Sequence, residues 1–275
     1  MLQDVFGFPI DLCRPQDLGF LRNYGLPFFA QARPQSGTLC FGMESARYGR
    51  LLIRFAGAAI TGGIAPEAAV AGLQNAMPIY ERLYPHPALI KLQGHGPAAG
   101  GYAAIFRWAE GVSLRDEDAR QELRRQPLLS RLRMIDSVFD LHLFAAKNGY
   151  APVAFSDGSL IADFTAGSVA VCDIDLYRPM PAENDMGRMH GSSHFMSPEE
   201  FALGAPLDGL SAQYNMGALA FFFFGEYGSR ERAAWTAGEP LYRVAERACR
   251  ERREKRWPSL EDFVNAWRGA AGETM

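Results

Sequence analysis

Short apolar runs broken by glycine dominate the first part of the chain. Residues 36–57 alternate in this way, which is typical of a β-hairpin. Residues 66–83 instead carry apolar side chains at helical spacing, and Pro78 is expected to kink this helix or to mark a boundary in it. Two further strands are predicted around a turn, within residues 86–96 and 101–111. The first ~110 residues therefore predict a small sheet with one helix.

Helical spacing dominates the second part of the chain. Residues 128–149 read as a long amphipathic helix that ends at an Asn-Gly pair. Residues 218–225 are strongly apolar but too short to span a bilayer, so they predict the centre of a buried helix. Ser197 is expected to be the N-cap of another helix, with Pro198 at its first position. Further helices are expected over residues 240–255 and 258–270, and two short strands between residues 150 and 175.

Composition narrows the class of protein. The chain has 275 residues, of which 48% are hydrophobic and 21% charged, as in an ordinary globular protein with a substantial core. A net charge of −3 argues against nucleic acid as the main partner. The four cysteines are far apart, and no charged and apolar leader opens the sequence, so we expect a reducing, cytoplasmic setting and no membrane partner.

Several motifs in the second part occur in the order found in protein kinases. The segment 190–200, HGSSHFMSPEE, is similar to the G-T-x-x-Y-x-A-P-E sequence that closes a kinase activation loop. The segment 172–175, CDID, stands at the distance where kinases carry D-F-G, and YNMGALAFF resembles the start of the central helix of the large lobe. Lastly, KRWPSLEDF resembles the R-P-S segment near the kinase C-terminus, which implies that Arg256 pairs with Glu199.

The first part carries matching motifs. HPALIKL, residues 86–92, resembles the H-P-N-I-V-K-L sequence after the kinase αC helix, and FRWAEGVSL, residues 106–114, resembles the hinge. Together the motifs resemble a degenerate bacterial protein kinase of the eukaryotic-like Ser/Thr type. The resemblance implies an α+β, two-lobed fold with a small β-rich N-lobe and a larger, mainly α-helical C-lobe. The expected boundaries are 1–35 for an irregular N-terminal extension, 36–112 for the N-lobe and 113–275 for the C-lobe.

The resemblance also implies which residues of the first part would hold ATP. Gly37 and Gly42 match the first and third glycines of the phosphate-binding loop, but Leu39 replaces the middle one. Phe106 and Trp108 belong to the hinge-like segment and are expected to contact the nucleotide. Arg54 occupies the position of the phosphate-binding lysine, and its forked guanidinium is no substitute for a point-charge ammonium. The helix that should supply the partner glutamate offers Ala76 or Met77 there, with Glu67 and Glu81 nearby.

The expected catalytic loop lacks its base. Aligning GYAPVAFSDGSLI with the kinase G-Y-V-H-R-D-L-K-P-x-N-I-L places Ala154 on the catalytic aspartate, and an alanine can neither accept nor orient a proton. Asp157, three residues on, is the nearest replacement, although an Asp-Gly turn is the favoured explanation for it. Ala212 replaces the aspartate of the central helix that anchors this loop, and no polar pair remains to be anchored.

Magnesium would bind beside this loop. Asp173 corresponds to the D-F-G aspartate, whereas Asp163, which precedes a phenylalanine, fits the spacing less well. Asp175 could face the same ion or cap the next turn, and Ser159 stands where kinases have a metal-binding asparagine.

These losses favour a pseudokinase that binds nucleotide, a protein partner or both. One alternative is an active, divergent Ser/Thr protein kinase that transfers the γ-phosphate of ATP to a protein substrate through Arg54, Asp157 and Asp173 with Mg²⁺. A second alternative is a nucleotide-free protein-interaction module.

Overall fold

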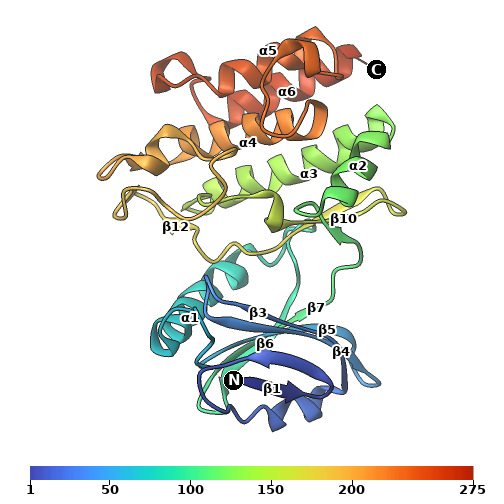
Figure 1. Ribbon diagram of the computed structural model, residues 1–275. Helices are drawn as coiled ribbons and strands as arrows, with labels where there is room; N and C mark the ends of the chain where they lie inside the picture. Colours follow the sequence, from blue (N-terminus) through green and yellow to red (C-terminus); the bar gives the residue numbers. More distant parts are fainter. Residues whose placement is uncertain (275) are drawn as a thin grey trace. The chain divides into compact units, whose positions relative to one another are not determined.

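The computed structural model describes residues 1–274, which divide into two compact units. Unit 1 comprises Met1–Tyr84 and Ile90–Ala109, and unit 2 comprises Pro85–Leu89 and the chain from Glu110 onward. The protein is of the mixed α+β class, with a five-stranded sheet in unit 1 and most of the helices in unit 2 (Figure 1).

Unit 1 is built on an antiparallel sheet with one helix against it. The sheet has the order β3-β4-β5-β7-β6, and α1 packs on β5, β6 and β7. The elements are β3 (Leu26–Arg33), β4 (Thr38–Ser45), β5 (Gly49–Ala56), α1 (Pro66–Leu83), β6 (Leu92–Ala98) and β7 (Gly101–Arg107). The predicted hairpin, helix and final strand pair of this region are confirmed. Pro78 lies at an exposed position inside α1, and the helix continues past it to Leu83 instead of ending there.

Alternation along the strands gives this sheet two different faces. Phe41, Ile53 and Phe55 lie in the core cluster on one face. The opposite face carries Phe106, whose ring is 5.0 Å from that of Tyr80 on α1. Both faces are therefore covered within unit 1.

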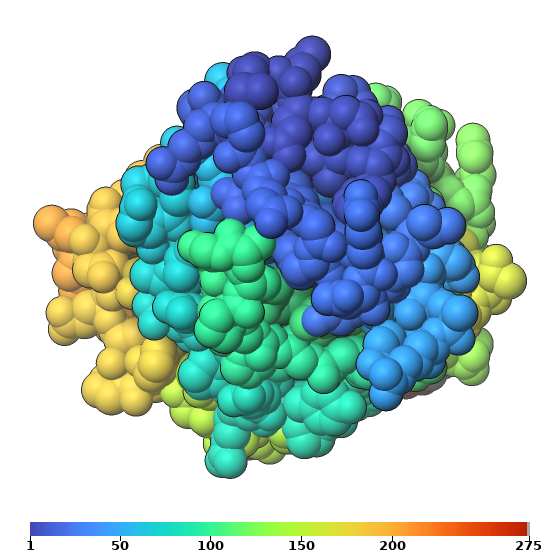
Figure 2. All heavy atoms as spheres, turned by 90° about the horizontal axis from the view of Figure 1, so that it is seen from below, coloured from blue at the N-terminus to red at the C-terminus, as the bar shows by residue number. Residues whose placement is uncertain are grey.

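The N-terminal residues are part of this unit, so the expectation of an irregular extension over residues 1–35 is wrong. They form β1 (Leu2–Val5) and β2 (Phe8–Asp11), a 3-10 turn η1 (Gly19–Tyr24) and the edge strand β3. Leu12 and Leu21 are completely buried in the core cluster of the sheet. In Figure 2 the dark-blue N-terminal residues form a continuous part of the surface of unit 1. Burial of their apolar side chains against β4 and β5 is the physical reason for their order.

Unit 2 is mainly helical, with short strands between its helices. Its helices are α2 (Glu117–Arg125), α3 (Leu128–Lys147), α4 (Gly209–Phe224), α5 (Glu239–Ala248) and α6 (Leu260–Thr274). Its strands are β8 (Val112–Ser113), β9 (Tyr150–Ala151), β10 (Leu160–Asp163), β11 (Ser168–Val171), β12 (Arg178–Pro179), β13 (Ala182–Glu183) and β14 (Pro206–Leu207). The 3-10 turns are η2 (Asp157–Ser159), η3 (Pro198–Phe201), η4 (Arg232–Ala234) and η5 (Arg253–Lys255).

Helix α4 is the centre of unit 2. All its residues from Ser211 to Phe224 are buried, and it contacts α3, α5 and α6, as the apolar run at 218–225 predicts (Figure 1). Asp208 caps its first turn by accepting hydrogen bonds from the backbone N–H groups of Leu210 and Ser211. Within residues 1–274, no helix is both long enough and apolar enough to cross a membrane.

Two predicted helices of unit 2 are shorter in the structure. The segment that begins at Ser197 forms only the 3-10 turn η3 instead of a helix. The charged helix expected over residues 240–255 ends at Ala248 and is followed by η5. Glu200 accepts a hydrogen bond from the Ser197 N–H at the start of η3, and the backbone is already extended at Ala202, directly after this turn. After α5, Nε of Arg256 donates to the Arg250 carbonyl in the segment that replaces the expected last turn of the helix.

Candidate functional site

The loop between β9 and β10, residues 152–159, has no carboxylate at the position where the kinase resemblance expects the base. Ala154 occupies that position with a φ of 58°, a left-handed conformation that is uncommon for a residue with a side chain. Its backbone N–H donates a 2.9 Å hydrogen bond to Oε1 of Glu200. The methyl group contributes no acid or base, so at this position only the backbone makes a polar contact.

Glu200 is the residue that holds this loop in place. Besides the Ala154 N–H, its carboxylate accepts hydrogen bonds from the Ser197 N–H (2.7 Å), the Ser197 hydroxyl (3.0 Å) and the Asn215 side-chain amide (2.7 Å). Burial raises the pKa of Glu200, and the bonds from Asn215, Ser197 and Ala154 act in the opposite direction. One buried carboxylate therefore ties together the loop, η3 and α4.

Sequence reasoning missed this anchor. Ala212 is fully buried and apolar on α4, as the prediction of a lost aspartate requires. No polar side-chain pair was expected in the loop, and the group that is anchored is a backbone one, because the Ala154 N–H donates to Oε1 of Glu200, a residue outside the helix. A sequence pattern that could have pointed to Glu200 is the capping-box spacing, in which Ser197 is followed three residues later by a glutamate.

Asp157 lies in the same loop and is buried, and both of its carboxylate oxygens accept hydrogen bonds. Its Oδ1 accepts from the Gly158 N–H at 2.9 Å, which is the local bond of an Asp-Gly turn. Its Oδ2 accepts from the Tyr227 hydroxyl at 3.2 Å. Burial, followed by the charge of Asp157, raises the pKa of Tyr227. Arg115 lies against Gly158 so closely that a side chain at Gly158 would overlap its guanidinium.

Ser159 and Asp173 lie near each other at the end of this loop. The Cys172 N–H donates to the Ser159 carbonyl at 2.8 Å, and Asp173 follows at once. Asp173 is exposed and left-handed, with a φ of 60°, while the adjacent Ile174 is buried. Asp175 is half-buried. Among residues 1–274 no group of three or more Asp, Glu, His or Cys side chains is placed to hold a metal ion.

The expected nucleotide-binding residues of unit 1 lie in its sheet. Arg54 is buried on β5, the third strand after residue 25, between Cys40 of β4 and Ala104 of β7. The nearby acid Glu81 on α1 pairs with His95 at 3.0 Å. The sequence-predicted alternatives Ala76 and Met77 are buried and apolar. Position 54 therefore carries a cation on β5, the middle strand of the five-stranded sheet.

Different structural constraints explain why positions 37 and 42 are glycines. Gly37 ends the β3–β4 turn with a φ of 63°, and a Cβ there would lie 2.6 Å from that of Ala69. Gly42 lies inside β4 rather than in the turn, and a Cβ there would be 2.8 Å from the Phe28 ring.

The two hinge-like aromatic residues both pack inside unit 1. Trp108 packs on Phe28 at 4.9 Å, and Phe106 packs on Tyr80 at 5.0 Å.

The ion pair predicted for the C-terminal half is confirmed. Nη2 of Arg256 lies 3.0 Å from Oε1 of Glu199, and both side chains are buried. Arg253 joins the same carboxylate at 3.1 Å and also pairs with Asp208 at 2.7 Å. This cluster fixes η3 to α4 and to the segment after α5.

No protein-family model matches the chain, and no curated protein is similar to it in sequence.

Proposed function

We propose that the protein is a protein-kinase-like domain of the bacterial, eukaryotic-like Ser/Thr type in which phosphotransfer is impaired, and that it acts by binding nucleotide, a protein partner or both. The observation that carries the proposal is the loop 152–159. It has Ala154 where a kinase needs its base, and its shape is maintained by Glu200 through a backbone hydrogen bond. A base is needed to accept the substrate proton during phosphoryl transfer. The loop therefore keeps a conformation without keeping its chemistry.

The order of elements in unit 1 supports the kinase-like part of the proposal. Three antiparallel strands of the five-stranded sheet precede α1, and its other two strands follow the helix. The cation Arg54 lies on the third strand, where kinases carry the lysine that binds phosphates. A guanidinium retains the charge needed for phosphate but presents it as a planar fork.

The Glu199–Arg256 ion pair supports the same reading from unit 2. Removal of one partner of a buried ion pair leaves the other charge buried without compensation, which strongly destabilises a protein. The pair therefore has a structural role that is independent of catalysis. The structural pair is present while the groups that would perform catalysis are replaced. That selective pattern is expected of a fold retained for binding.

An active kinase would need Asp157 in place of the missing base. Both oxygens of Asp157 already accept hydrogen bonds, one from Gly158 and one from Tyr227. A carboxylate engaged in this way is a structural acceptor, so Asp157 is better explained as a turn residue. This favours the impaired domain over the active enzyme.

Calorimetric titration with ATP, with and without Mg²⁺, tests the proposal. We expect the wild type to bind ATP, and we expect Arg54→Gln to weaken that binding about 10-fold because a charge-assisted contact to phosphate is lost. Asp173→Ala reports whether a metal contributes, and Asp118→Ala on the exposed face of α2 is the matched control for removing one carboxylate.

Binding lost in Arg54→Gln and retained in Asp118→Ala would support a nucleotide-binding pseudokinase. Failure of ATP to bind under any condition would contradict the nucleotide part and leave protein binding as the activity. Transfer of the γ-phosphate to a protein would contradict the impaired state.

A further inference from the structure

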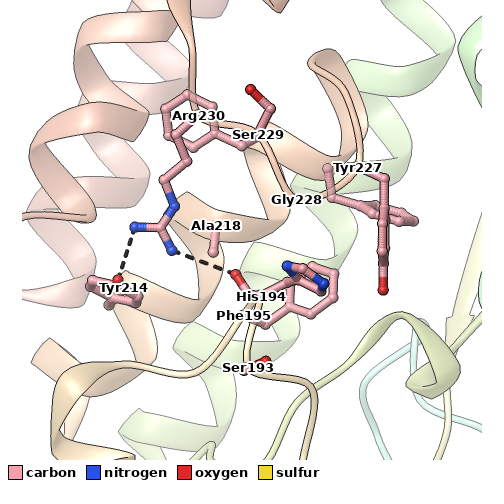
Figure 3. Close-up of a pocket in the computed structure, with 11 residues that line it drawn as sticks. Ser193, His194, Phe195, Tyr214, Ala218, Tyr227, Gly228, Ser229 and Arg230 are labelled. Carbon is pink, nitrogen blue, oxygen red and sulfur yellow. Dashed lines mark hydrogen bonds between the residues drawn. The ribbon is translucent and has the colours of Figure 1, made fainter.

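Unit 2 contains a cavity of about 370 Å³ at the side of α4 (Figure 3). It lies between the segment before η3, the middle of α4 and the loop that follows the helix. The lining residues are Ser193, His194, Phe195, Tyr214, Ala218, Phe221, Phe222, Tyr227, Gly228, Ser229 and Arg230.

The lining of this cavity has a positive electrostatic character. It includes one guanidinium, one imidazole and two serine hydroxyls, and no Asp or Glu belongs to it. The remaining walls are mostly aromatic, and such surfaces lower the local dielectric and strengthen the attraction of an anion to Arg230. A negatively charged ligand is therefore favoured over a neutral or positive one.

Arg230 enters the cavity without a carboxylate partner among the described residues. Its Nη1 donates to the Tyr214 hydroxyl at 2.8 Å, and its Nη2 reaches the His194 carbonyl at 3.5 Å, as drawn in Figure 3. The guanidinium has five N–H donors, so three remain for a ligand. The nearby Arg232, by contrast, is paired with Glu239 at 2.5 Å.

The wall opposite Arg230 is held in place by ring contacts. The imidazole of His194 lies 4.8 Å from the ring of Tyr227 (Figure 3). Gly228, with a φ of 77°, lies directly against that imidazole, and a Cβ there would be 3.0 Å from its Cε1. Tyr227 is fixed in turn by its bond to Asp157. Ring contacts and a hydrogen bond thus hold the exposed side chains of His194 and Tyr227 in position.

We propose that this cavity binds the phosphate group of a phosphate monoester. A phosphate offers several acceptor oxygens, which match the free N–H groups of Arg230 and the hydroxyls of Ser193 and Ser229. The aromatic walls would contact the organic part of the ester. The same group is carried by small phosphate esters and by phosphorylated side chains of proteins. This inference is independent of ATP binding and of the residues of unit 1.

Titration with phenyl phosphate and with inorganic phosphate, monitored by calorimetry, tests the site. We expect phenyl phosphate to bind the wild type at millimolar concentration or below. Its dissociation constant should rise about 10-fold in Arg230→Gln, because a charge-assisted contact is lost. Arg232→Gln removes a charge two residues away and should leave binding unchanged. Circular dichroism establishes that each variant is folded, and Arg230→Lys, which keeps the charge, should bind with an intermediate affinity.

The possible outcomes show whether the site exists and which kind of molecule supplies the phosphate group. Tighter binding of phenyl phosphate than of inorganic phosphate supports a monoester, and a phosphoserine peptide that competes with it would identify a phosphorylated protein as the source. Equal affinities support a site for free phosphate. No binding to the wild type, or equal binding to Arg230→Gln, would overturn the proposal.

Discussion

Glu200 brings four hydrogen-bond donors to one buried carboxylate. A buried carboxylate is costly unless its oxygens are well paired, and here the donors come from the loop, η3 and α4. The side chain thus performs the anchoring role that a polar residue of the central helix would have in a kinase. Its removal would take this acceptor away from all four donors, of which the Asn215 amide also donates to the Phe195 carbonyl.

Glu200→Ala is expected to lower the free energy of unfolding by about 3 kcal/mol, since buried donors that lose their acceptor are expensive. Urea denaturation measures this loss. Glu226→Ala, at an exposed position, is the matched control and should change stability by less than about 0.5 kcal/mol. A loss in Glu200→Ala as small as that of the control would contradict the anchoring role.

His142 provides a second buried polar contact near the loop. Its Nδ1 donates to the Val138 carbonyl at 2.8 Å, and its Nε2 accepts from the Tyr177 hydroxyl at 3.0 Å, which fixes the neutral tautomer. Complete burial lowers the pKa of His142 from 6.5 to about 4. Between these two values the unfolded chain binds a proton that the folded protein does not bind.

Stability should therefore fall as the pH decreases from 6.5 to about 4, by roughly 3 kcal/mol from this group alone. Other groups titrate in the same range, so the difference between wild type and His142→Gln isolates the effect. Denaturation at several pH values should show a shallower loss in His142→Gln, while the exposed His190→Gln keeps the wild-type slope. Identical slopes in all three proteins would rule out His142 as the titrating group.

At the scale of elements, the structure differs most from the prediction in the N-terminal segment, where strands form that the hydrophobic pattern did not predict. β3 contains Pro27 followed by two phenylalanines, and a bulge between Pro27 and Phe29 shifts its register. This hides the period-2 alternation by which strands are predicted. The helices α3 and α4, by contrast, follow from long apolar patterns and were predictable.

Leu21→Ala tests the contribution of this segment to the core. Leu21 lies in the turn η1 and is completely buried against the sheet, so its truncation should cost about 3 kcal/mol of unfolding free energy. Its exposed neighbour Arg22 gives the control substitution Arg22→Ala, for which little change is expected. Equal stability of the two variants in urea would mean that residues 1–24 do not support the fold of unit 1.

Contacts of the candidate site could be predicted from the sequence only where both residues belong to recognisable motifs. The Glu199–Arg256 pair follows from two recognisable segments, and the structure confirms it. The bond from Tyr227 to Asp157 joins residues 70 positions apart, and that from Ala154 to Glu200 joins residues 46 apart. Neither contact leaves a local pattern in the sequence. The cavity around Arg230 depends on similar long-range packing, which only the fold supplies.

At the scale of the whole molecule, the buried groups that stabilise the fold are present, whereas the groups that the kinase resemblance assigns to catalysis are replaced. Buried pairs that stabilise the chain are present, including Glu199–Arg256 and the Glu200 network. The positions that the kinase resemblance assigns to proton and phosphate chemistry carry Ala154 and Arg54 instead. The mixed α+β architecture is therefore compatible with a domain that binds without transferring phosphate.

The most direct test of this account is a phosphotransfer assay with radiolabelled ATP and Mg²⁺, using wild type and Asp157→Asn with a generic protein acceptor. The account predicts no incorporation of the γ-phosphate above background in either protein, since Ala154 supplies no base and Asp157 is held by Tyr227 and Gly158. Incorporation by the wild type that Asp157→Asn abolishes would contradict it and identify an active kinase with a relocated base.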